Sequence, residues 1–281
     1  MYNDSKKREF IKLAPEIRVL TLKSLLHANS GHTAGSLGLV DIFTYLFFYA
    51  LKIDPKKPNR QDRDRFILSN GHVAPALYAT MAKRGFFPEE ELKTLRKFGS
   101  RLQGHPHREF LPGLDTSSGP LGEGLSQALG MALADRLDNG YKSQRYFYCV
   151  MGDGELNEGQ VWEAALHAGK EKPHNLIAIV DRNDIQIDGY THDVMPLEPL
   201  EDKWKAFGWH TQVINGHDFD EIHSAIEEAK VVNNKPSCII ALTVAGKGYP
   251  EFERDPFWHG RPPSKEQVEK AIKYIEKHAY A

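Results

Sequence analysis

Short apolar runs alternate along this chain with longer segments in which apolar residues recur at helical spacing. Continuous apolar runs, which are typical of buried strands, lie at 65–68, 146–151, 176–180, 208–214 and 236–244. The helical spacing predicts helices over 5–28, 39–50, 74–84, 125–137, 199–208 and 219–230, one that opens at 87–92, and a last one after Ser264. This alternation predicts a doubly wound α/β domain, with a mainly parallel sheet and helices on both faces.

The stretch from 146 to 183 has the pattern of a strand–helix–strand unit. Its first strand stops at Gly152-Asp153-Gly154, and its second, 176–180, leads into Asp181-Arg182-Asn183. Between them, Asn157 and Gln160 have the spacing of a capping box, which predicts a helix that begins at Asn157 and ends near Gly169. The crossover should be right-handed and its two strands parallel.

Two polar residues, Asp153 and Asn183, follow the two strands of this unit. The carboxyl ends of parallel strands meet at one edge of the sheet, and ligands bind at that edge in open α/β sheets. A carboxylate and an amide oxygen suit a hard cation such as Mg²⁺, and the amides of a glycine turn at a helix start suit an anion. A Gly-Asp-Gly sequence alone is as typical of a surface turn as of a ligand site. The whole strand–helix–strand pattern, however, favours a site for a cation and a phosphate.

Four histidines lie in glycine-containing loops. His32 is in the segment 30–38, His72 follows the strand at 65–68, His105 lies in 103–107, and His259 precedes Gly260. A single loop histidine is most often an unremarkable polar residue. Because the same arrangement recurs in His32, His72 and His105, these three favour one shared pocket, and His259 is a fourth loop histidine.

The loop from Asp115 to Gly124 is also rich in glycine, and it enters a predicted helix with small residues along it. Its backbone amides are suited to cradle a diphosphate. A tight turn before a buried helix explains the same pattern equally well.

The composition limits the class of protein but does not indicate a ligand. The chain has 281 residues, of which 41% are hydrophobic and 26% charged, with a net charge of −2 that gives no sign of a nucleic-acid or membrane surface. No apolar run reaches the roughly 18 residues of a spanning helix, and the start has no signal-peptide pattern. Cys149 and Cys238 lie in apolar runs and predict core thiols in a reducing compartment. We expect one domain over 1–281, with 249–281 as a terminal loop and helix.

Seven segments together resemble the transketolases. They are SGHTAGSLG, LSNGH, QGHP, SSGPLGEG, GDGELNEGQVWEA, NLIAIVDRNDIQIDG and WHG, in this order and over nearly the whole chain from about Leu20 to Gly260. The resemblance covers only the amino-terminal, diphosphate-binding domain of that family, whose full-length members are more than twice as long. It implies the first subunit of a split transketolase, whose partner carries the pyrimidine-binding domain. It also implies an α₂β₂ heterotetramer, a cytoplasmic location and a role in the pentose phosphate pathway.

The resemblance implies a role for each matching residue. Asp153, Asn183 and the carbonyl of Ile185 would hold Mg²⁺ (or Ca²⁺), and Gly154 would donate its amide to the diphosphate. The histidines would serve as catalytic residues, with His72 and His259 against the cofactor and His32 and His105 along the substrate channel. The remaining cofactor contacts would be Gly119, Leu121, Gly122, Gly152 and Glu158, with Glu158 and Glu163 near the subunit contact. The sequence departs from the family at SGHTAG, where SGHPG is commoner, and at Arg182.

The implied activity is transfer of a two-carbon ketol unit from a ketose phosphate to an aldose phosphate, with thiamine diphosphate supplying the carbanion chemistry. The glutamate that activates the cofactor belongs to the absent pyrimidine domain, so we expect the chain to be inactive alone. Two alternative hypotheses involve the same cofactor: the chain could be the α subunit of a 2-oxo acid dehydrogenase or a fragment of a deoxyxylulose phosphate synthase. A third is a non-catalytic cofactor-binding module. A fourth hypothesis is that the sequence is part of a longer chain. The capping box predicted for the last helix argues against it.

Overall fold

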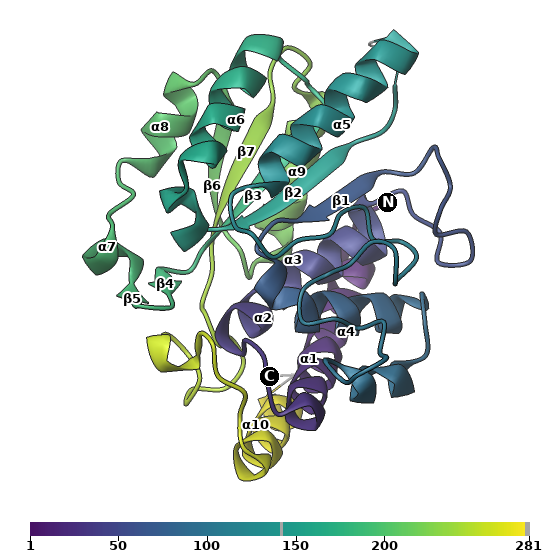
Figure 1. The fold of residues 1–281 in the computed structure, drawn as a ribbon, viewed down its shortest axis with the longest axis vertical. Helices are drawn as coiled ribbons and strands as arrows, with labels where there is room; N and C mark the ends of the chain where they lie inside the picture. Colours follow the sequence, from purple (N-terminus) through teal and green to yellow (C-terminus); the bar gives the residue numbers. More distant parts are fainter. Residues whose placement is uncertain (141–142, 279–281) are drawn as a thin grey trace.

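The computed structural model describes residues 1–140 and 143–278. Its centre is a five-stranded sheet in the order β1-β2-β3-β7-β6, in which every neighbouring pair is parallel (Figure 1). The strands are β1 (Arg65–Leu68), β2 (Phe147–Gly152), β3 (Leu176–Arg182), β6 (His210–Asn215) and β7 (Ser237–Leu242). The predicted parallel sheet is confirmed, and each strand begins and ends within two residues of its expected position.

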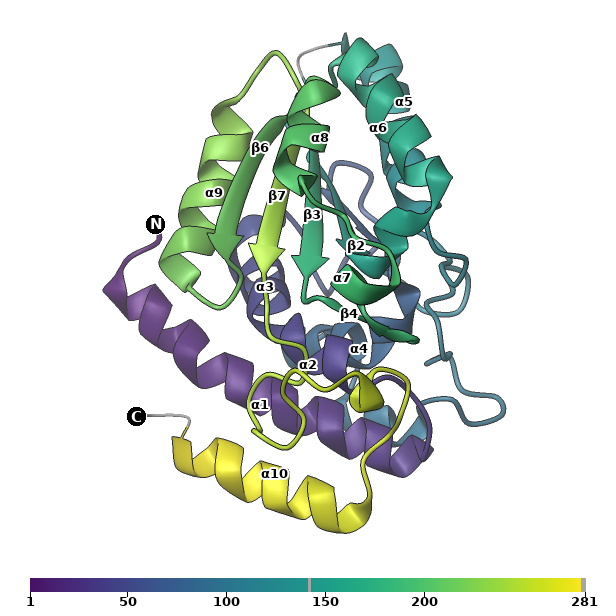
Figure 2. The same cartoon turned by 90° about the vertical axis from the view of Figure 1, so that its left-hand side faces the viewer.

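Helices cover both faces of the sheet because alternate strand residues point in opposite directions. From β2, Tyr148 and Val150 pack with one core, whereas Phe147, Cys149 and Met151 pack with the other. The first core is closed by α1 (Asp4–Ala28), α3 (Val40–Tyr45), α4 (Ala74–Arg84) and α9 (Phe219–Val231). The second is closed by α5 (Gly124–Asn139), α6 (Gly159–Glu171) and α8 (Leu200–Ala206), and Figure 2 shows the two helix layers.

The first and last helices of the chain pack together below the sheet in the view of Figure 2. The last helix, α10 (Lys265–His278), lies beside α1 (Figure 2) and shares with it a third apolar cluster that includes Leu22 and Ile275. The predicted capping box at its start is confirmed: the Ser264 amide donates to Gln267 Oε1 at 3.0 Å, and the Gln267 amide donates to Ser264 Oγ at 3.3 Å. The terminal segment was expected to run to 281; its last three residues lie outside the described residues.

The capping box predicted at Asn157 is wrong. A 3₁₀ turn, η5 (Gly154–Asn157), comes first, and α6 then begins at Gly159 with Glu158 at the N-cap and no side-chain cap. The Asn157 side-chain amide instead donates to the carbonyl of Met195 at 3.4 Å. A tertiary contact therefore takes the side chain that local sequence assigned to the helix start.

The segment from residue 30 to residue 50 also differs from the prediction. Half of the expected loop at 30–38 is helical, as α2 (Ala34–Gly38), and the expected helix at 39–50 is α3 followed by a π-helix, η1 (Leu46–Ala50). A Cβ on Gly38 would lie 3.0 Å from the carbonyl oxygen of Val244. This close approach explains why glycine is needed where α2 meets the segment after β7.

The remaining elements are short. The strand β1 leads into η2 (Gly71–Val73), and 87–92 forms the 3₁₀ helix η3 (Glu89–Thr94) rather than an α-helix. After β3 come the hairpin strands β4 (Ile185–Gln186) and β5 (Gly189–Tyr190), and then α7 (Thr191–Val194). The 3₁₀ turn η6 (Pro256–Trp258) precedes His259. Both cysteines are buried and free, and no helix of the described residues is long and apolar enough to cross a membrane.

Candidate active site

Loops from several strands meet at the carboxyl edge of the sheet. Asp153 follows β2 and Asn183 follows β3, and these strands are neighbours. The amide of Asp153 donates to the carbonyl of Asp181 at 3.1 Å, which continues the strand pairing to the edge. Residues separated by thirty positions in the sequence are therefore held side by side by the parallel register.

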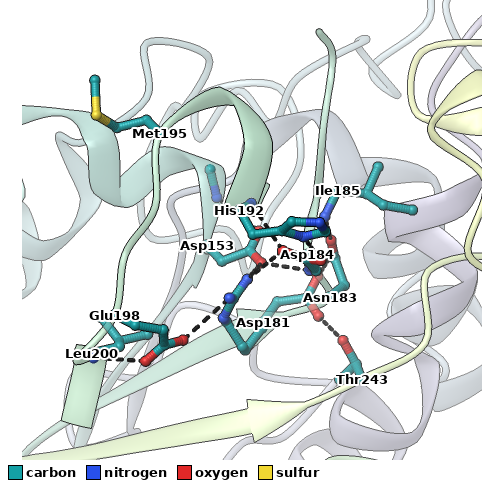
Figure 3. Close-up of polar contacts among 12 residues, drawn as sticks. Asp153, Asp181, Asn183, Asp184, Ile185, His192, Met195, Glu198, Leu200 and Thr243 are labelled. Carbon is teal, nitrogen blue, oxygen red and sulfur yellow. Dashed lines mark hydrogen bonds and ion pairs between the residues drawn. The ribbon is translucent and has the colours of Figure 1, made fainter. Parts of the chain in front are cut away.

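The carboxylate of Asp153 is almost completely buried, at 1% exposed, and fully hydrogen-bonded. Its Oδ1 accepts from the Gly154 amide at 2.7 Å, and its Oδ2 accepts from the Asp184 amide at 2.6 Å and from Arg182 Nη1 at 2.8 Å (Figure 3). Burial raises the pKa of Asp153, and the Arg182 guanidinium opposes that rise. In this structure the Gly154 amide, expected to serve the diphosphate, is directed at Asp153.

The side-chain amide of Asn183 is oriented by a second buried carboxylate. Asn183 Nδ2 donates to Asp181 Oδ2 at 2.8 Å, and Asn183 Oδ1 accepts from the Ile185 amide at 2.9 Å (Figure 3). The hydroxyl of Thr243 also donates to Asp181, whose pKa is raised to about 7 by burial and by the nearby Asp153. No role was predicted for Asp181, although a carboxylate at the end of an apolar strand was a signal available in the sequence.

Three of the four predicted histidines form one cluster. The ring centroids of His32 and His72 are 4.9 Å apart, those of His72 and His259 are 5.2 Å apart, and those of His32 and His259 are 5.5 Å apart. They come from the loop before α2, from η2 and from the segment after η6. Burial lowers the pKa of all three rings, that of His32 to about 4, so they are neutral at pH 7.

His105 lies on the rim of this cluster, against the 115–124 loop. A Cβ on Gly119 would lie 3.7 Å from the His105 ring, and burial and the charge of Arg96 lower the pKa of His105. Arg96 itself ties two histidine-bearing loops together: it donates to Ser30 Oγ at 3.0 Å and to the carbonyl of Gly104 at 3.4 Å. No sequence pattern singled out Arg96.

The buried carboxylate of Glu155, for which the sequence predicted no role, joins three of the loops. It accepts from the Gly122 amide at 2.8 Å, from the Gly152 amide at 3.0 Å and from the Ser69 hydroxyl. Burial raises the pKa of Glu155. Two of the glycines predicted at the cofactor thus use their amides to hold the site together.

Other predicted residues line the approach to the site. Gly122 has a positive φ of 86°, and a Cβ there would lie 2.8 Å from the Cβ of Glu158, so the loop fits closely against the start of α6. Leu121 is 39% exposed beside it. Glu158 and Glu163 are both exposed.

The site contains polar groups that lack partners, as a site for a polar cofactor should. Both side-chain polar atoms of Asn70 are buried and unpaired, as are His32 Nδ1 and Gln186 Oε1. Buried polar atoms are costly unless something satisfies them. Among the described residues, no group of three or more His, Cys, Asp or Glu is arranged to hold a metal. The expected metal ligands include only one such side chain, because the others are an amide and a backbone carbonyl.

Comparison with known proteins identifies the family. Residues 10–278 match the family model described as transketolase, thiamine diphosphate binding domain. The chain is 46% identical over 261 residues to the 6-deoxy-6-sulfo-D-fructose transketolase subunit SqwG of Clostridium sp. (strain MSTE9), covering 93% of this chain and 94% of that protein. It is 41% identical over 248 residues to an apulose-4-phosphate transketolase subunit of Phocaeicola vulgatus, covering 88% of this chain and 87% of that protein.

A solved structure shows the same fold in a longer chain. Transketolase from Campylobacter jejuni superposes with a TM-score of 0.90 at 36% identity, covering 97% of this chain but only 43% of that one. The chain therefore spans less than half the length of that transketolase and nearly all of the two subunits. From these matches and its parallel sheet, the chain belongs to the transketolase family, as the thiamine diphosphate-binding domain of enzymes that transfer two-carbon ketol units.

Proposed function

We propose that this chain is the cofactor-binding subunit of a two-subunit transketolase that moves a ketol unit between sugar phosphates and requires a divalent cation. The observation that carries the proposal is that two groups meet at one edge of the sheet. Asp153 and Asn183 follow the parallel strands β2 and β3, and His72, which clusters with His32 and His259, follows the neighbouring parallel strand β1. The first group suits the cation and diphosphate, and the second suits a polyhydroxylated substrate.

The chain's own residues divide the work of holding the cofactor. Asp153, the Oδ1 of Asn183 and the carbonyl of Ile185 would hold Mg²⁺ or Ca²⁺, both of which prefer oxygen ligands. Asn70 offers an unpaired amide at the same edge, beside Gly152. When bound, thiamine diphosphate supplies the carbanion chemistry that breaks and forms the carbon–carbon bond.

The neutral histidines are suited to bind sugar hydroxyls and to move their protons. A neutral imidazole has one donor and one acceptor nitrogen, so adjacent rings can accept a proton from one hydroxyl and donate one to another. Burial keeps His32, His72 and His259 in this neutral form. The loops that carry His32 and His259 are linked, because the hydroxyl of Thr33 donates to the carbonyl of Arg261 at 2.5 Å.

A partner subunit is expected to cover the mouth of the site. Several large apolar side chains around it are between 39% and 71% exposed: Leu121, Ile187, Tyr190, Val194, Met195 and Phe257. Exposed apolar patches of this kind mark interaction surfaces. We assign them to the subunit that brings the pyrimidine-binding domain and the activating glutamate, in an α₂β₂ assembly. Two buried free thiols also fit a reducing, cytoplasmic location.

The donor sugar is open to direct test, and the relatives suggest two chemical classes. One related subunit is named for a sulfonated deoxyketose and another for a ketose phosphate. We propose a ketose with a terminal anion, either phosphate or sulfonate.

The test is a ketol-transfer assay with thiamine diphosphate and Mg²⁺. Xylulose 5-phosphate and 6-deoxy-6-sulfofructose would be compared as donors, with ribose 5-phosphate and glyceraldehyde 3-phosphate as acceptors. The chain alone should be silent and should gain activity when a pyrimidine-domain subunit is co-expressed. Substitution His259→Ala should remove that activity, while Glu266→Gln, at an exposed position of α10, should not change it. Activity of the single chain would overturn the two-subunit proposal. Lack of activity of the two-subunit protein with every donor would overturn the proposed reaction.

A further inference from the structure

Arg182 lies where a cation would otherwise be expected. Its Nη1 is 2.8 Å from Asp153 Oδ2, the carboxylate assigned above to the metal, and 3.1 Å from Asp184 Oδ1. Its Nη2 is 3.2 Å from Glu198 Oε1. One guanidinium is thus shared among three carboxylates that come from the end of β2, the hairpin after β3 and the start of α8 (Figure 3).

The three carboxylates differ greatly in exposure. The side chain of Asp153 is 1% exposed, whereas those of Asp184 and Glu198 are 36% and 65% exposed. A buried carboxylate without a positive partner is strongly destabilising, but an exposed one is solvated by water. Arg182 is therefore needed mainly by Asp153 when no metal is bound, and the other two carboxylates can hold the same guanidinium at the protein surface.

We propose that Arg182 is an internal counter-ion that competes with the divalent cation for Asp153. In the metal-free subunit it neutralises the buried carboxylate, and when the cation binds, the guanidinium leaves Asp153 Oδ2 and stays on Asp184 and Glu198. The inference rests on the proposed metal site. Arg182 would then be a positioning residue that lowers the metal affinity and keeps the empty site folded.

Geometry favours a short displacement over a large rearrangement. The Asp184 amide donates to the same Asp153 Oδ2 at 2.6 Å, so the hairpin stays anchored after Arg182 moves away. Glu198 is itself fixed, because its Oε2 accepts from the Leu200 amide at 2.9 Å. The receiving carboxylates are thus in place before any metal arrives.

The test measures binding of Mn²⁺ alone to the full chain, with free Mn²⁺ followed by electron paramagnetic resonance. Removal of a charge-assisted competitor should tighten Mn²⁺ binding by about tenfold in Arg182→Gln. Arg182→Lys keeps the charge and should stay near wild type, and Asp153→Asn should bind much more weakly. A purely structural role for Arg182 predicts the opposite sign, because a disordered site binds metal less well.

Each outcome has a separate meaning. If Arg182→Gln binds Mn²⁺ no tighter than wild type while Asp153→Asn loses binding, the metal site stands and the counter-ion role is wrong. If Asp153→Asn binds as wild type does, the proposed metal site fails, and the counter-ion role with it. Anomalous diffraction from wild-type crystals soaked in Mn²⁺ tests the inference without any variant. Mn²⁺ bound with Arg182 still on Asp153 Oδ2 would overturn it.

Discussion

The buried ion pair beneath the histidine loops offers the most quantitative prediction. Asp41, on α3, accepts from Arg18 Nη2 at 2.5 Å and from His217 Nδ1 at 2.7 Å, and both ion-pair side chains are only 7% exposed. His217 Nε2 accepts from the Val244 amide at 2.7 Å, so Nδ1 carries the proton. This network joins α1, α3 and the ends of β6 and β7 under the site.

Asp41→Asn should strongly destabilise the protein at pH 7. The carboxylate is buried, but Arg18 and His217 outweigh that burial and lower the pKa of Asp41 from 3.8 to about 2. At about 1.4 kcal/mol per pKa unit, this difference is worth about 2 kcal/mol of unfolding free energy. The substitution also leaves a buried guanidinium unpaired, so the total loss should be about 3–5 kcal/mol.

The sign of the pH dependence follows from the lowered pKa. The folded protein binds the Asp41 proton more weakly than the unfolded chain does, so this stabilisation is complete above about pH 4. It is lost as the pH falls from 3.8 toward 2. The difference in unfolding free energy between wild type and Asp41→Asn should therefore shrink over that interval.

Urea unfolding followed by tryptophan fluorescence measures both quantities, because Trp204 and Trp209 are buried. Glu266→Gln, which removes an exposed ion pair with Lys270, is the matched control and should leave the transition midpoint unchanged. A loss below about 1 kcal/mol in Asp41→Asn, or a loss that stays constant down to pH 3, would refute the reasoning.

Three further predictions concern the site itself. Gly124→Ala should destabilise the protein by about 1–3 kcal/mol, because the new Cβ would lie 2.3 Å from the Cβ of Ser69. Gly130→Ala, in the same helix, meets nothing within 4 Å and should stabilise the protein by up to about 1 kcal/mol. Equal shifts of the two melting temperatures would contradict this prediction. Glu155→Ala should lower the free energy of unfolding by about 2–4 kcal/mol, because the Gly122 and Gly152 amides lose their acceptor. It should also weaken thiamine diphosphate binding, which calorimetry measures. Unchanged binding would count against this role of Glu155. By ¹⁵N NMR, the His32 ring should stay neutral down to about pH 5 and titrate near 4, and titration near 6.5 would show that it is solvated.

The fold class and the place of the candidate site can both be predicted from the sequence. The apolar runs at 146–151 and 176–180 predict two buried neighbours of a parallel sheet, and polar residues at their ends must then share one edge. The capping box at Ser264 could also be predicted, because both of its hydrogen bonds join residues three positions apart. These features depend on local spacing, which a linear pattern contains.

Tertiary structure alone decided which side chains complete the site. Arg96 reaches Ser30 across 66 residues, and Glu155 reaches Gly122 across 33 residues, so no local pattern points to either. The same cause misplaced the start of α6, where Asn157 bonds to Met195 instead of capping the helix. Burial, which shifts the pKa values of His32 and Asp181, also depends on packing between distant segments. Contacts and desolvation of this kind exist only once the chain has folded.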